Sequence, residues 1–471
     1  MELTLSQSHT ETCRLYIQTF GCQMNEYDSH CVLRSLISRG YCITSHITQA
    51  DVIFLNTCCV REKAEQKAFS FLGRLRRLKE RRPSLRIIVA GCLAQQLGTG
   101  LLARFDHVDL VVGTRGIPSV SHLAEEVRRT THRMAYLPED DPECHYDTFP
   151  ETIFNSPVAS PVTIMQGCDN FCTYCIVPFV RGRERSRPSE MILQEIRKLV
   201  DGGAREVLLL GQNVNSYGSG LKEVIGFPEL LRQIHTIPNL LRIRFTTSHP
   251  KDLNEDLIRC FADLPKLCKH LHLPFQAGSD RVLKRMNRGY TSSEYHEKIQ
   301  KLREVCPDIG LSSDVMVGFP GETEEDFQET VRLLESVQFD TLFSFRYSDR
   351  PGTKSSQFPD KVDESIKARR LKELQGVQDA ITRRKYLAEQ GKVKEVLVEG
   401  PSKASNGQMT GRTHQNRIVN FDGPSNLIGK AVDVRIVTAF SHSLRGDLLP
   451  AYLKGSAPST ENSKEASCSG K

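Results

Sequence analysis

Short apolar runs alternate with longer amphipathic stretches along the first part of the chain. Strands are expected over 14–20, 51–57, 86–91 and 109–113. Helices are expected over 26–39 and 61–81, after the strand 86–91, and after the last strand to about residue 129. Strands that alternate with helices at this spacing predict an α/β domain, a doubly wound parallel sheet with helices on both faces. Residues 134–158 have no periodicity and are expected to form a linker.

The same alternation continues through the middle of the chain. Strands are expected over 162–166, 206–210, 241–247, 270–274, 311–317 and 341–345. Helices are expected between them, for example over 190–201, 252–263 and 324–336, and a long helix over 364–389 closes this part. Six such units fit a partial (β/α)6 barrel, a fold whose chemistry lies at the C-terminal ends of the strands.

Beyond residue 387 the pattern changes to short strands broken by Gly, Pro and Asn. They are expected over 392–399, 408–412, 417–421 and 431–437, which is typical of a small all-β barrel. The chain is therefore expected to contain domains over 13–130, 154–384 and 387–453. The remaining residues, 454–471, are rich in Ser, Glu and Lys and are expected to form a disordered tail.

Composition indicates an ordinary globular protein, with 39% hydrophobic and 25% charged residues. No stretch approaches the roughly 20 apolar residues of a membrane helix. The first residues have neither the apolar core of a secretory signal nor the Arg-rich face of a transit peptide. We expect a cytoplasmic protein without a membrane segment, and nothing in the sequence demands more than a monomer.

Basic residues are concentrated in local runs, although the net charge is only +6. One run contains Arg181, Arg183, Arg185 and Arg187, and others lie near residues 74–82 and 383–385. Each run could be a solvated helix face. Guanidinium groups at 181–187 would also suit the phosphates of an RNA.

Three of the fifteen cysteines lie close together in GCDNFCTYC, at positions Cys168, Cys172 and Cys175. The C-x3-C-x2-C motif follows a predicted strand and so lies on a loop at its C-terminal end. Three thiolates there can bind three irons of a [4Fe–4S] cluster and leave the fourth iron open to a ligand. Structural zinc is the alternative, but it would require a fourth Cys or His at local spacing.

Three further cysteines, Cys22, Cys58 and Cys92, each follow a predicted strand of the first domain. Because the C-terminal ends of parallel strands face one crevice, these thiols can converge on a second cluster. Each alone could be a packing choice. The glycines before Cys22 and Cys92 would permit sharp turns. Cys59 is expected to point elsewhere and not to bind metal.

Other strand-end residues are candidates for cofactor binding. They are Gln212, Asn213 and Asn215 after the second barrel strand, and Gly318 and Phe319 after the fifth. The amides could instead stabilise a loop, and the GFPGE turn could simply begin a helix. His249 and Gln276 occupy similar positions.

Several motifs resemble the radical-SAM methylthiotransferases, and the likeness extends from about 14 to 450. The motifs are TFGCQMNEYDS, FLNTCCVRE, GCDNFCTYCIVPFVRGRERSR, LLLGQNVNSYG, TTSHP, HLPFQAGSD, VGFPGET and FSFRYSDRPGT. GCQMNEYDS and GQNVNSY are similar to the bacterial branch that acts on isopentenylated adenosine in tRNA. GRTHQNRIVNF resembles the RNA-binding TRAM barrel. Phe275 and Ala277 depart from the smaller and hydroxylated residues expected in HLPFQAGS.

The resemblance implies two [4Fe–4S] clusters and two molecules of S-adenosylmethionine (SAM) per turnover. The cluster on Cys168, Cys172 and Cys175 would cleave SAM to a radical that removes the C2 hydrogen of N6-isopentenyladenosine next to the anticodon, at position 37. The cluster on Cys22, Cys58 and Cys92 would donate sulfur for the methylthio group. The implied partners are the tRNA anticodon stem-loop and an electron donor such as flavodoxin or ferredoxin.

Two other functions remain open at this point. The chain could methylthiolate a protein side chain, but the context of the first cysteine, Gln23-Met24-Asn25, favours tRNA. It could also be a non-catalytic, metal-stabilised RNA-binding protein, but an open three-cysteine motif on a barrel loop argues against this.

Overall fold

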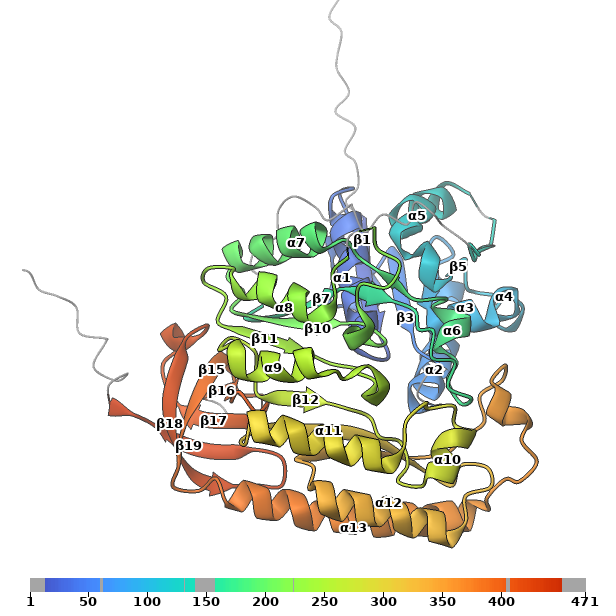
Figure 1. Cartoon of the computed structure of the whole chain (residues 1–471). Coiled ribbons are helices and arrows are strands. Elements are labelled where there is room, and N and C mark those ends of the chain that lie inside the picture. Colours follow the sequence, from blue (N-terminus) through green and yellow to red (C-terminus); the bar gives the residue numbers. More distant parts are fainter. Residues whose placement is uncertain are drawn as a thin grey trace, which may run out of the picture. The chain divides into compact units, whose positions relative to one another are not determined.

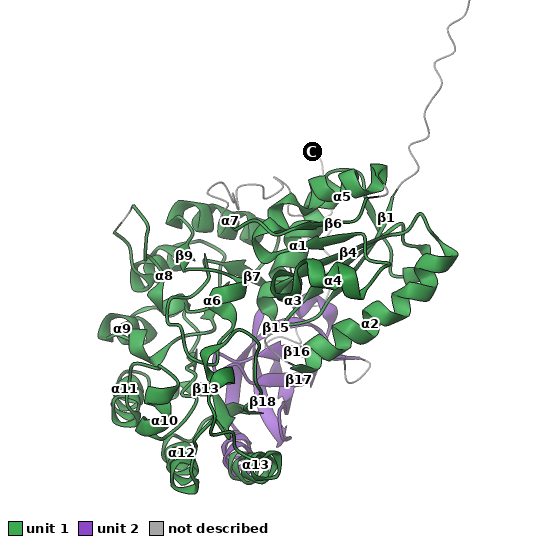
Figure 2. Ribbon diagram, turned by 90° about the vertical axis from the view of Figure 1, so that its right-hand side faces the viewer, with its two compact units in different colours: residues 1–378 green, residues 379–471 purple. Residues whose placement is uncertain are grey.

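The computed structural model describes residues 13–59, 62–130, 132–139, 157–222, 224–403 and 407–450. The chain forms two compact units, residues 1–378 and 379–471 (Figure 2). The first unit contains the N-terminal sheet and the larger barrel, and the second contains the small barrel. The expected disordered tail, 454–471, lies outside the described residues.

The N-terminal sheet is parallel throughout, in the order β2-β1-β3-β4-β5-β6 (Figure 1). Its strands are β1 Arg14–Thr19, β2 Cys42–Ile43, β3 Val52–Thr57, β4 Arg86–Gly91, β5 Leu110–Val112 and β6 Met134–Tyr136. Its helices are α1 Gln23–Ile37, α2 Glu62–Arg81, α3 Cys92–Leu97, α4 Thr99–Arg104 and α5 Val120–Arg129. The strand order reverses between β1 and β3, and ligands of such sheets bind outside the strand ends at that switch point.

Both faces of this sheet are covered, which explains the continuous apolar run in β3. Val52 and Phe54 pack in one core cluster with residues of α1 and α5, whereas Ile53 and Leu55 pack in a second cluster with residues of α2, α3 and α4. A strand buried on both faces has no polar alternation. The doubly wound α/β prediction is therefore confirmed.

One part of the linker prediction is wrong, because residues 134–136 form β6. This edge strand pairs in parallel with β5, from Leu110↔Met134 to Val112↔Tyr136. A short edge strand needs only backbone hydrogen bonds on one side, so it requires no recognisable side-chain period. The rest of the expected linker, from 140 to 156, lies outside the described residues.

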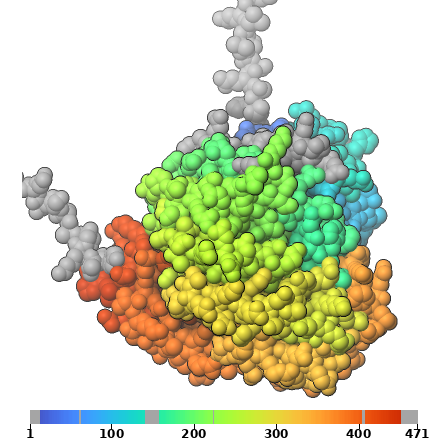
Figure 3. Space-filling model, viewed as in Figure 1, coloured from blue at the N-terminus to red at the C-terminus, as the bar shows by residue number. Residues whose placement is uncertain are grey.

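The larger barrel consists of six parallel strands with helices outside them, as predicted. The strands are β7 Ala159–Thr163, β10 Glu206–Leu210, β11 Arg242–Phe245, β12 His270–His272, β13 Gly310–Val317 and β14 Thr341–Arg346. They form the sheets β11-β10-β7 and β12-β13-β14, and a parallel bridge from Ile243 to Leu267 connects β11 to the segment before β12. The outer helices are α7 Ser189–Asp201, α8 Phe227–His235, α9 Glu255–Asp263, α10 Asp280–Arg285, α11 Ser292–Val305 and α12 Glu324–Val337. Their side chains cover much of the face that Figure 3 shows, in green to yellow.

The first barrel strand lies earlier in the chain than expected. Residues 159–163 pair with β10, whereas Met165–Gln166 form a separate strand, β8, which is antiparallel to β9 (Arg185–Ser186). The predicted strand 162–166 therefore merges two elements. Gly167 follows β8 directly and begins the cysteine loop.

The second unit contains a closed barrel in the order β15-β16-β17-β19-β18. The strands are β15 Val393–Pro401, β16 Gln408–Arg412, β17 Ile418–Asp422, β18 Ala431–Ala439 and β19 Leu444–Leu448, and α13, Glu364–Leu387, leads into them. The all-β prediction is confirmed. β19 was not expected because its sequence, LRGDL, contains two charged residues and a glycine. Among the described residues, no helix is both long and apolar enough to cross a membrane.

Candidate functional site

The loop between β8 and α6 (Val177–Val180) carries Cys168, Cys172 and Cys175 beyond the first barrel strand. Gly167 has a φ of +76°, and a Cβ there would lie 2.1 Å from the carbonyl oxygen of Arg183. A side chain is therefore excluded where the loop begins. The backbone N–H of Cys168 donates to the Gly182 carbonyl at 3.3 Å, which closes the loop at its base.

Residues from later parts of the barrel hold this loop in place. The side-chain oxygen of Gln212 accepts a hydrogen bond from the Gly167 N–H at 2.5 Å. Lys251 donates to the side-chain oxygen of Asn170 at 2.7 Å, and Asn287 donates to the Asn170 carbonyl at 3.0 Å. These hydrogen bonds tie the cysteine loop to other parts of the barrel.

The three thiols of the loop are close enough to influence one another electrostatically. Burial, reinforced by the charge of Cys172, raises the pKa of Cys175 to about 12, and burial also raises the pKa of Cys168. Cys168 and Cys175 would be protonated without metal, and a metal must displace their protons when it binds.

Arg288 is a residue of this site that the sequence analysis missed. Its guanidinium donates to Cys172 Sγ at 3.4 Å, to the Pro274 carbonyl at 2.8 Å and to the Tyr290 hydroxyl at 3.2 Å. The side chain is buried, so it places a permanent positive charge beside the cysteine loop. The only signal in the sequence was a basic residue in MNRGY.

The second set of cysteines follows β1, β3 and β4, at the switch point of the N-terminal sheet. Gly21 has a φ of +139°, and a Cβ there would lie 2.5 Å from the Cβ of Cys58, so the two turns are in close contact. A hydrogen bond with Cys58 lowers the pKa of Cys22 to about 6. Cys22 is also the N-cap of α1, where backbone N–H groups favour a thiolate.

The expectation that Cys59 points away from this site is wrong. Cys59 hydrogen-bonds to Cys92, and this contact lowers the pKa of Cys92 to about 7 and raises that of Cys59. Cys22 and Cys92 are close enough for the charge of Cys22 to act on Cys92. The adjacent Cys58-Cys59 pair therefore contacts both of the other cysteines.

With the side chains in their present positions, no three His, Cys, Asp or Glu residues of the described chain are grouped to hold a metal ion. The donor chemistry nevertheless fits, because iron–sulfur clusters bind to Cys thiolates. Three thiols lie on one barrel loop and three lie at one edge of a sheet. The cysteine side chains of each set would have to move closer to one another to bind a cluster.

The expectation of RNA phosphate contacts is wrong for Arg181 and Arg187, which are buried. Arg181 pairs with Asp28 at 2.8 Å, and Arg187 pairs with Glu195 at 2.8 Å. Arg183 and Arg185 remain exposed. In the second unit, Arg417 is buried and paired with Glu389 at 2.8 Å.

The strand-end amides have different environments. Both polar ends of the Asn215 side chain bond to the backbone of His249, each at 2.9 Å, which ties two loops together. Asn213 donates to Asp252 at 2.7 Å, but its side-chain oxygen has no hydrogen-bond partner.

Two more buried polar atoms without a partner lie beyond β11: Ser248 Oγ and His249 Nε2. Burial and the charge of Arg288 lower the pKa of His249 to about 2, so its ring is neutral. Buried polar atoms normally have partners. With the side-chain oxygen of Asn213, they make three unpartnered polar atoms in the segments that follow β10 and β11.

The GFPGET turn begins a helix, which was one of its two earlier interpretations. Gly318 has a φ of +72°, and its N–H donates to Glu322 at 2.8 Å. Phe319 is fully buried and packs edge-on against Tyr347 and Phe358. A capping box of Thr323 and Asp326 begins α12. The turn starts a helix, and its contact with a cofactor stays a prediction, as it does for Gln212, Asn213 and Asn215.

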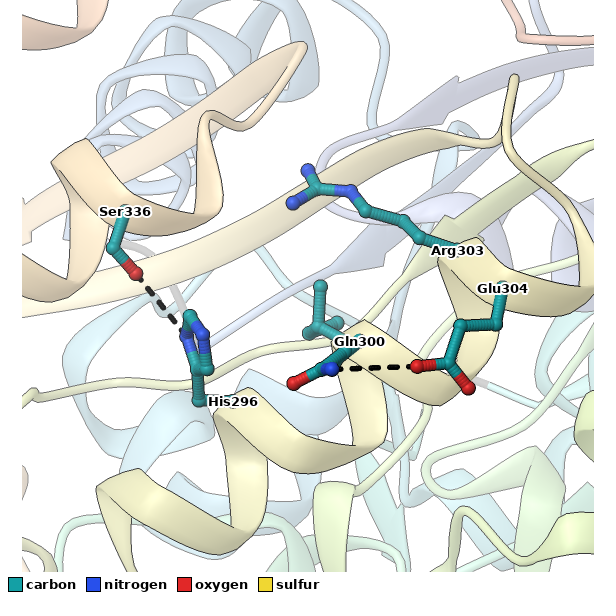
Figure 4. Close-up of a pocket in the computed structure, with 6 residues that line it drawn as sticks. His296, Gln300, Arg303, Glu304 and Ser336 are labelled. Atoms are coloured by element: carbon teal, nitrogen blue, oxygen red, sulfur yellow. Dashed lines mark hydrogen bonds between the residues drawn. The ribbon is translucent and has the colours of Figure 1, made fainter.

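A surface depression of about 410 Å³ lies on the outer helices, and no cysteine lines it (Figure 4). His296, Ile299, Gln300, Arg303 and Glu304 of α11 and Ser336 of α12 line it. His296 bonds to Ser336 at 3.1 Å and Gln300 to Glu304 at 3.3 Å. These polar side chains pair with one another, and they lie on outer helices rather than at the C-terminal ends of the barrel strands. We therefore assign the depression no part in the site.

Three family models match successive parts of the chain. The radical SAM superfamily matches residues 162–334, and the TRAM domain matches 387–449. A family described as uncharacterized, UPF0004, matches 14–113.

Full-length relatives are also found. A tRNA-2-methylthio-N(6)-dimethylallyladenosine synthase of Syntrophobacter fumaroxidans is 66% identical over 92% of this chain and 95% of that protein. One of Syntrophus aciditrophicus is 51% identical over 92% of this chain and 94% of that protein. Among solved structures, the chain is similar to the radical SAM methyltransferase TsrM of Kitasatospora setae, which was solved with cobalamin and a [4Fe–4S] cluster bound. The TM-score is 0.55 at 14% sequence identity, and the match covers 73% of this chain and 77% of that one. That likeness concerns the fold alone.

Proposed function

Because the chain belongs to the family of tRNA-2-methylthio-N(6)-dimethylallyladenosine synthases, we propose that it is a radical-SAM tRNA methylthiotransferase. It inserts a methylthio group at C2 of N6-isopentenyladenosine next to the anticodon, at position 37, and uses two SAM per turnover. The names of the relatives favour tRNA over a protein side chain as the substrate. Because these relatives are named as enzymes, they also argue against a non-catalytic, metal-stabilised RNA-binding protein.

Two [4Fe–4S] clusters would be held by the two cysteine sets. Cys168, Cys172 and Cys175 would hold one, and Cys22, Cys58 and Cys92 the other. When bound, the clusters and SAM supply a radical that can break an unactivated C–H bond and a sulfur that can be transferred. The protein contributes positioning, charge and the exclusion of water.

Individual residues support this division of tasks. Arg288 offsets the negative charge that gathers at the barrel loop, and Gln212 holds the start of that loop. The unpartnered atoms of Asn213, Ser248 and His249 are suited to the polar groups of SAM. Asn215, Gly318 and Phe319 are proposed to shape the same cofactor site, Asn215 by joining two loops and Gly318 by a turn with positive φ that Lys367 packs against.

The small barrel is proposed to hold the anticodon stem-loop of the tRNA. Lys430, Arg435 and Arg445 are exposed on it and can contact phosphates. Deletion of residues 387–471 should weaken binding of an anticodon stem-loop RNA and flatten its dependence on salt. Unchanged affinity and salt dependence would remove this role from the barrel.

The remaining parts of the proposal concern organisation and partners. The domains extend over 13–130, 154–384 and 387–453, with 454–471 as a tail. The protein acts as a cytoplasmic monomer and receives electrons from a donor such as flavodoxin or ferredoxin. Light scattering of the purified protein and SAM cleavage with each donor test these points.

The observation that carries the proposal is the presence of two separate three-cysteine sets, each at strand ends. The test is iron and sulfide content with Mössbauer spectra after anaerobic reconstitution. About eight irons, falling to about four in the Cys168/Cys172/Cys175 triple Ala variant, would match two four-iron clusters. About four irons falling to none would leave one cluster and exclude the N-terminal cysteines as ligands. Mass spectrometry of tRNA nucleosides would then identify the product.

A further inference from the structure

We infer that Arg181 is a positioning residue of the N-terminal cysteine site, where its guanidinium donates to the sulfur atoms of the group that Cys22, Cys58 and Cys92 would hold. Arg181 belongs to the radical-SAM part of the chain, only six positions after Cys175. The inference rests on the proposed function, because it requires a cluster at the N-terminal cysteines.

The segment after Cys175 packs directly against the N-terminal site. Ile176 and Val180 lie in one buried cluster with Cys59, Cys92 and the neighbouring residues of α2 and α3. The hydroxyl of Thr114 donates to the carbonyl of Val180. Ile176 and Val180 therefore connect the barrel cysteine loop to the second cysteine site, and Arg181 follows at the end of α6.

The guanidinium of Arg181 is incompletely paired although it is buried. Its Nη2 donates to Asp28 at 2.8 Å and to the side-chain oxygen of Asn25 at 3.3 Å. Its Nη1 is buried and has no hydrogen-bond partner. An unmade hydrogen bond from a buried charged group is costly, so a missing acceptor is expected at this position.

The position of Arg181 identifies that acceptor. The same Asn25 oxygen that binds Arg181 also accepts from Cys22 Sγ at 3.5 Å, so one atom separates the cation from the thiol. The charge of Arg181 acts on both Cys22 and Cys92. Asn25 further donates to the Thr57 carbonyl at 2.8 Å, directly before Cys58. An anionic sulfur-rich group held by these cysteines would satisfy Nη1, since hydrogen bonds to sulfur tune such clusters.

A second buried ion pair, which lies within the barrel and also contacts α1, separates structural effects from local ones. Arg187 pairs with Glu195 at 2.8 Å and donates to the Tyr27 hydroxyl of α1 at 3.4 Å. Its side chain is as buried as that of Arg181, at 3% exposure each. Loss of a mere interdomain clamp would affect both pairs alike.

The test uses the full chain with Cys168, Cys172 and Cys175 replaced by Ala, so that only the N-terminal cluster remains. After reconstitution, iron content is measured and the reduction potential is titrated by EPR. Arg181→Gln should lower the potential, because the added electron loses a nearby cation. We expect the equilibrium constant for reduction of the cluster to fall about tenfold, which lowers the potential by ~59 mV for a one-electron couple. Asp28→Asn should raise the potential. The potential of Arg181→Lys should stay near that of the parent variant, and Arg187→Gln should leave the potential unchanged.

An unchanged potential in Arg181→Gln with full iron content would overturn the inference, as would equal shifts in Arg181→Gln and Arg187→Gln. If Arg181→Gln fails to fold or to hold iron, Asp28→Asn decides by itself, and an unchanged potential there counts against the inference. If the parent triple variant holds no iron, the proposed function has failed at the N-terminal site, and the inference falls with it.

Discussion

Replacement of Gly21 by Ala should disable the N-terminal cysteine site while leaving the barrel site intact. The new Cβ would lie 2.5 Å from the Cβ of Cys58 and 3.3 Å from the side chain of Asn25, at a φ of +139°. The first contact is impossible without a shift of one cysteine turn relative to the other. Because the sheet fixes both strands, the cysteines themselves must move.

The magnitude follows from two terms. A non-glycine residue in a rare backbone region costs about 1–3 kcal/mol, and overpacking of a filled site costs about 1–3 kcal/mol more. Gly40→Ala is the matched control, since Gly40 also has a positive φ, +87°, but a Cβ there meets nothing within 4 Å. The difference between the two variants should therefore be about 1–3 kcal/mol, a factor of roughly 5 to 150 in the population of the competent site.

The assay is competition for iron between the reconstituted N-terminal cluster and a chelator, in the Cys168/Cys172/Cys175 triple Ala background. Gly21→Ala should lose iron at chelator concentrations that Gly40→Ala withstands. In the otherwise intact chain, Gly21→Ala should still cleave SAM but form little methylthiolated tRNA. Equal iron retention in both variants would refute the reasoning, because it would show that Cys22 and Cys58 need not keep this spacing.

Further outcomes test other parts of the molecule. Cys168→Ala should abolish SAM cleavage and product, whereas Cys58→Ala should lose methylthiolation and keep some SAM cleavage; loss of both activities in Cys58→Ala would argue against separate cluster roles. Arg288→Gln should weaken retention of the cluster at the barrel loop, because a buried cation and its 3.4 Å contact with Cys172 are lost. Mössbauer spectra that still show two clusters after treatment with a chelator would contradict this. Asp326 should stabilise the fold at neutral pH: burial opposes its ionisation, but hydrogen bonds from Arg281, Ser279 and Thr323 outweigh this and lower its pKa from 3.8 to about 2. The unfolded chain then binds the proton more readily, so about 2 kcal/mol of stability is present above pH 3.8 and is lost as the pH falls towards 2. Asp326→Asn should reduce the acid dependence of the melting temperature in this range, and an identical pH profile would be the contrary result.

Much of the fold could be predicted because it depends on local pattern. The strands of the N-terminal sheet are apolar on both faces, and β3 (VIFLNT) is recognisable for that reason. The elements that were missed or displaced are short or at edges. Met134–Tyr136 and Leu444–Leu448 are stabilised by pairing with strands that lie elsewhere in the chain, and three to five residues carry too little periodicity to predict this.

The sequence by itself determined the candidate chemistry. The C-x3-C-x2-C spacing places three thiols on one loop, and the three strand-end cysteines share one edge because parallel strands end on the same side. Both statements follow from chain connectivity, since neighbours on a loop and ends of parallel strands need no long-range information. The glycines that permit these turns, Gly21 and Gly91, were recognisable for the same reason, and both have positive φ.

Only the tertiary structure decided the use of the charged residues between the two sites. In sequence, Arg181 and Arg187 belong to a basic run that suits RNA phosphates. In the fold they are buried against Asp28 and Glu195, and Arg181 reaches a carboxylate 153 residues away. The partner of a charge is set by which surfaces the packed domains bring together, and a pattern along the chain carries no information about that. The contact of Cys59 with Cys92 and that of Arg288 with Cys172 arose in the same way, because packing brought together segments that lie apart in the sequence.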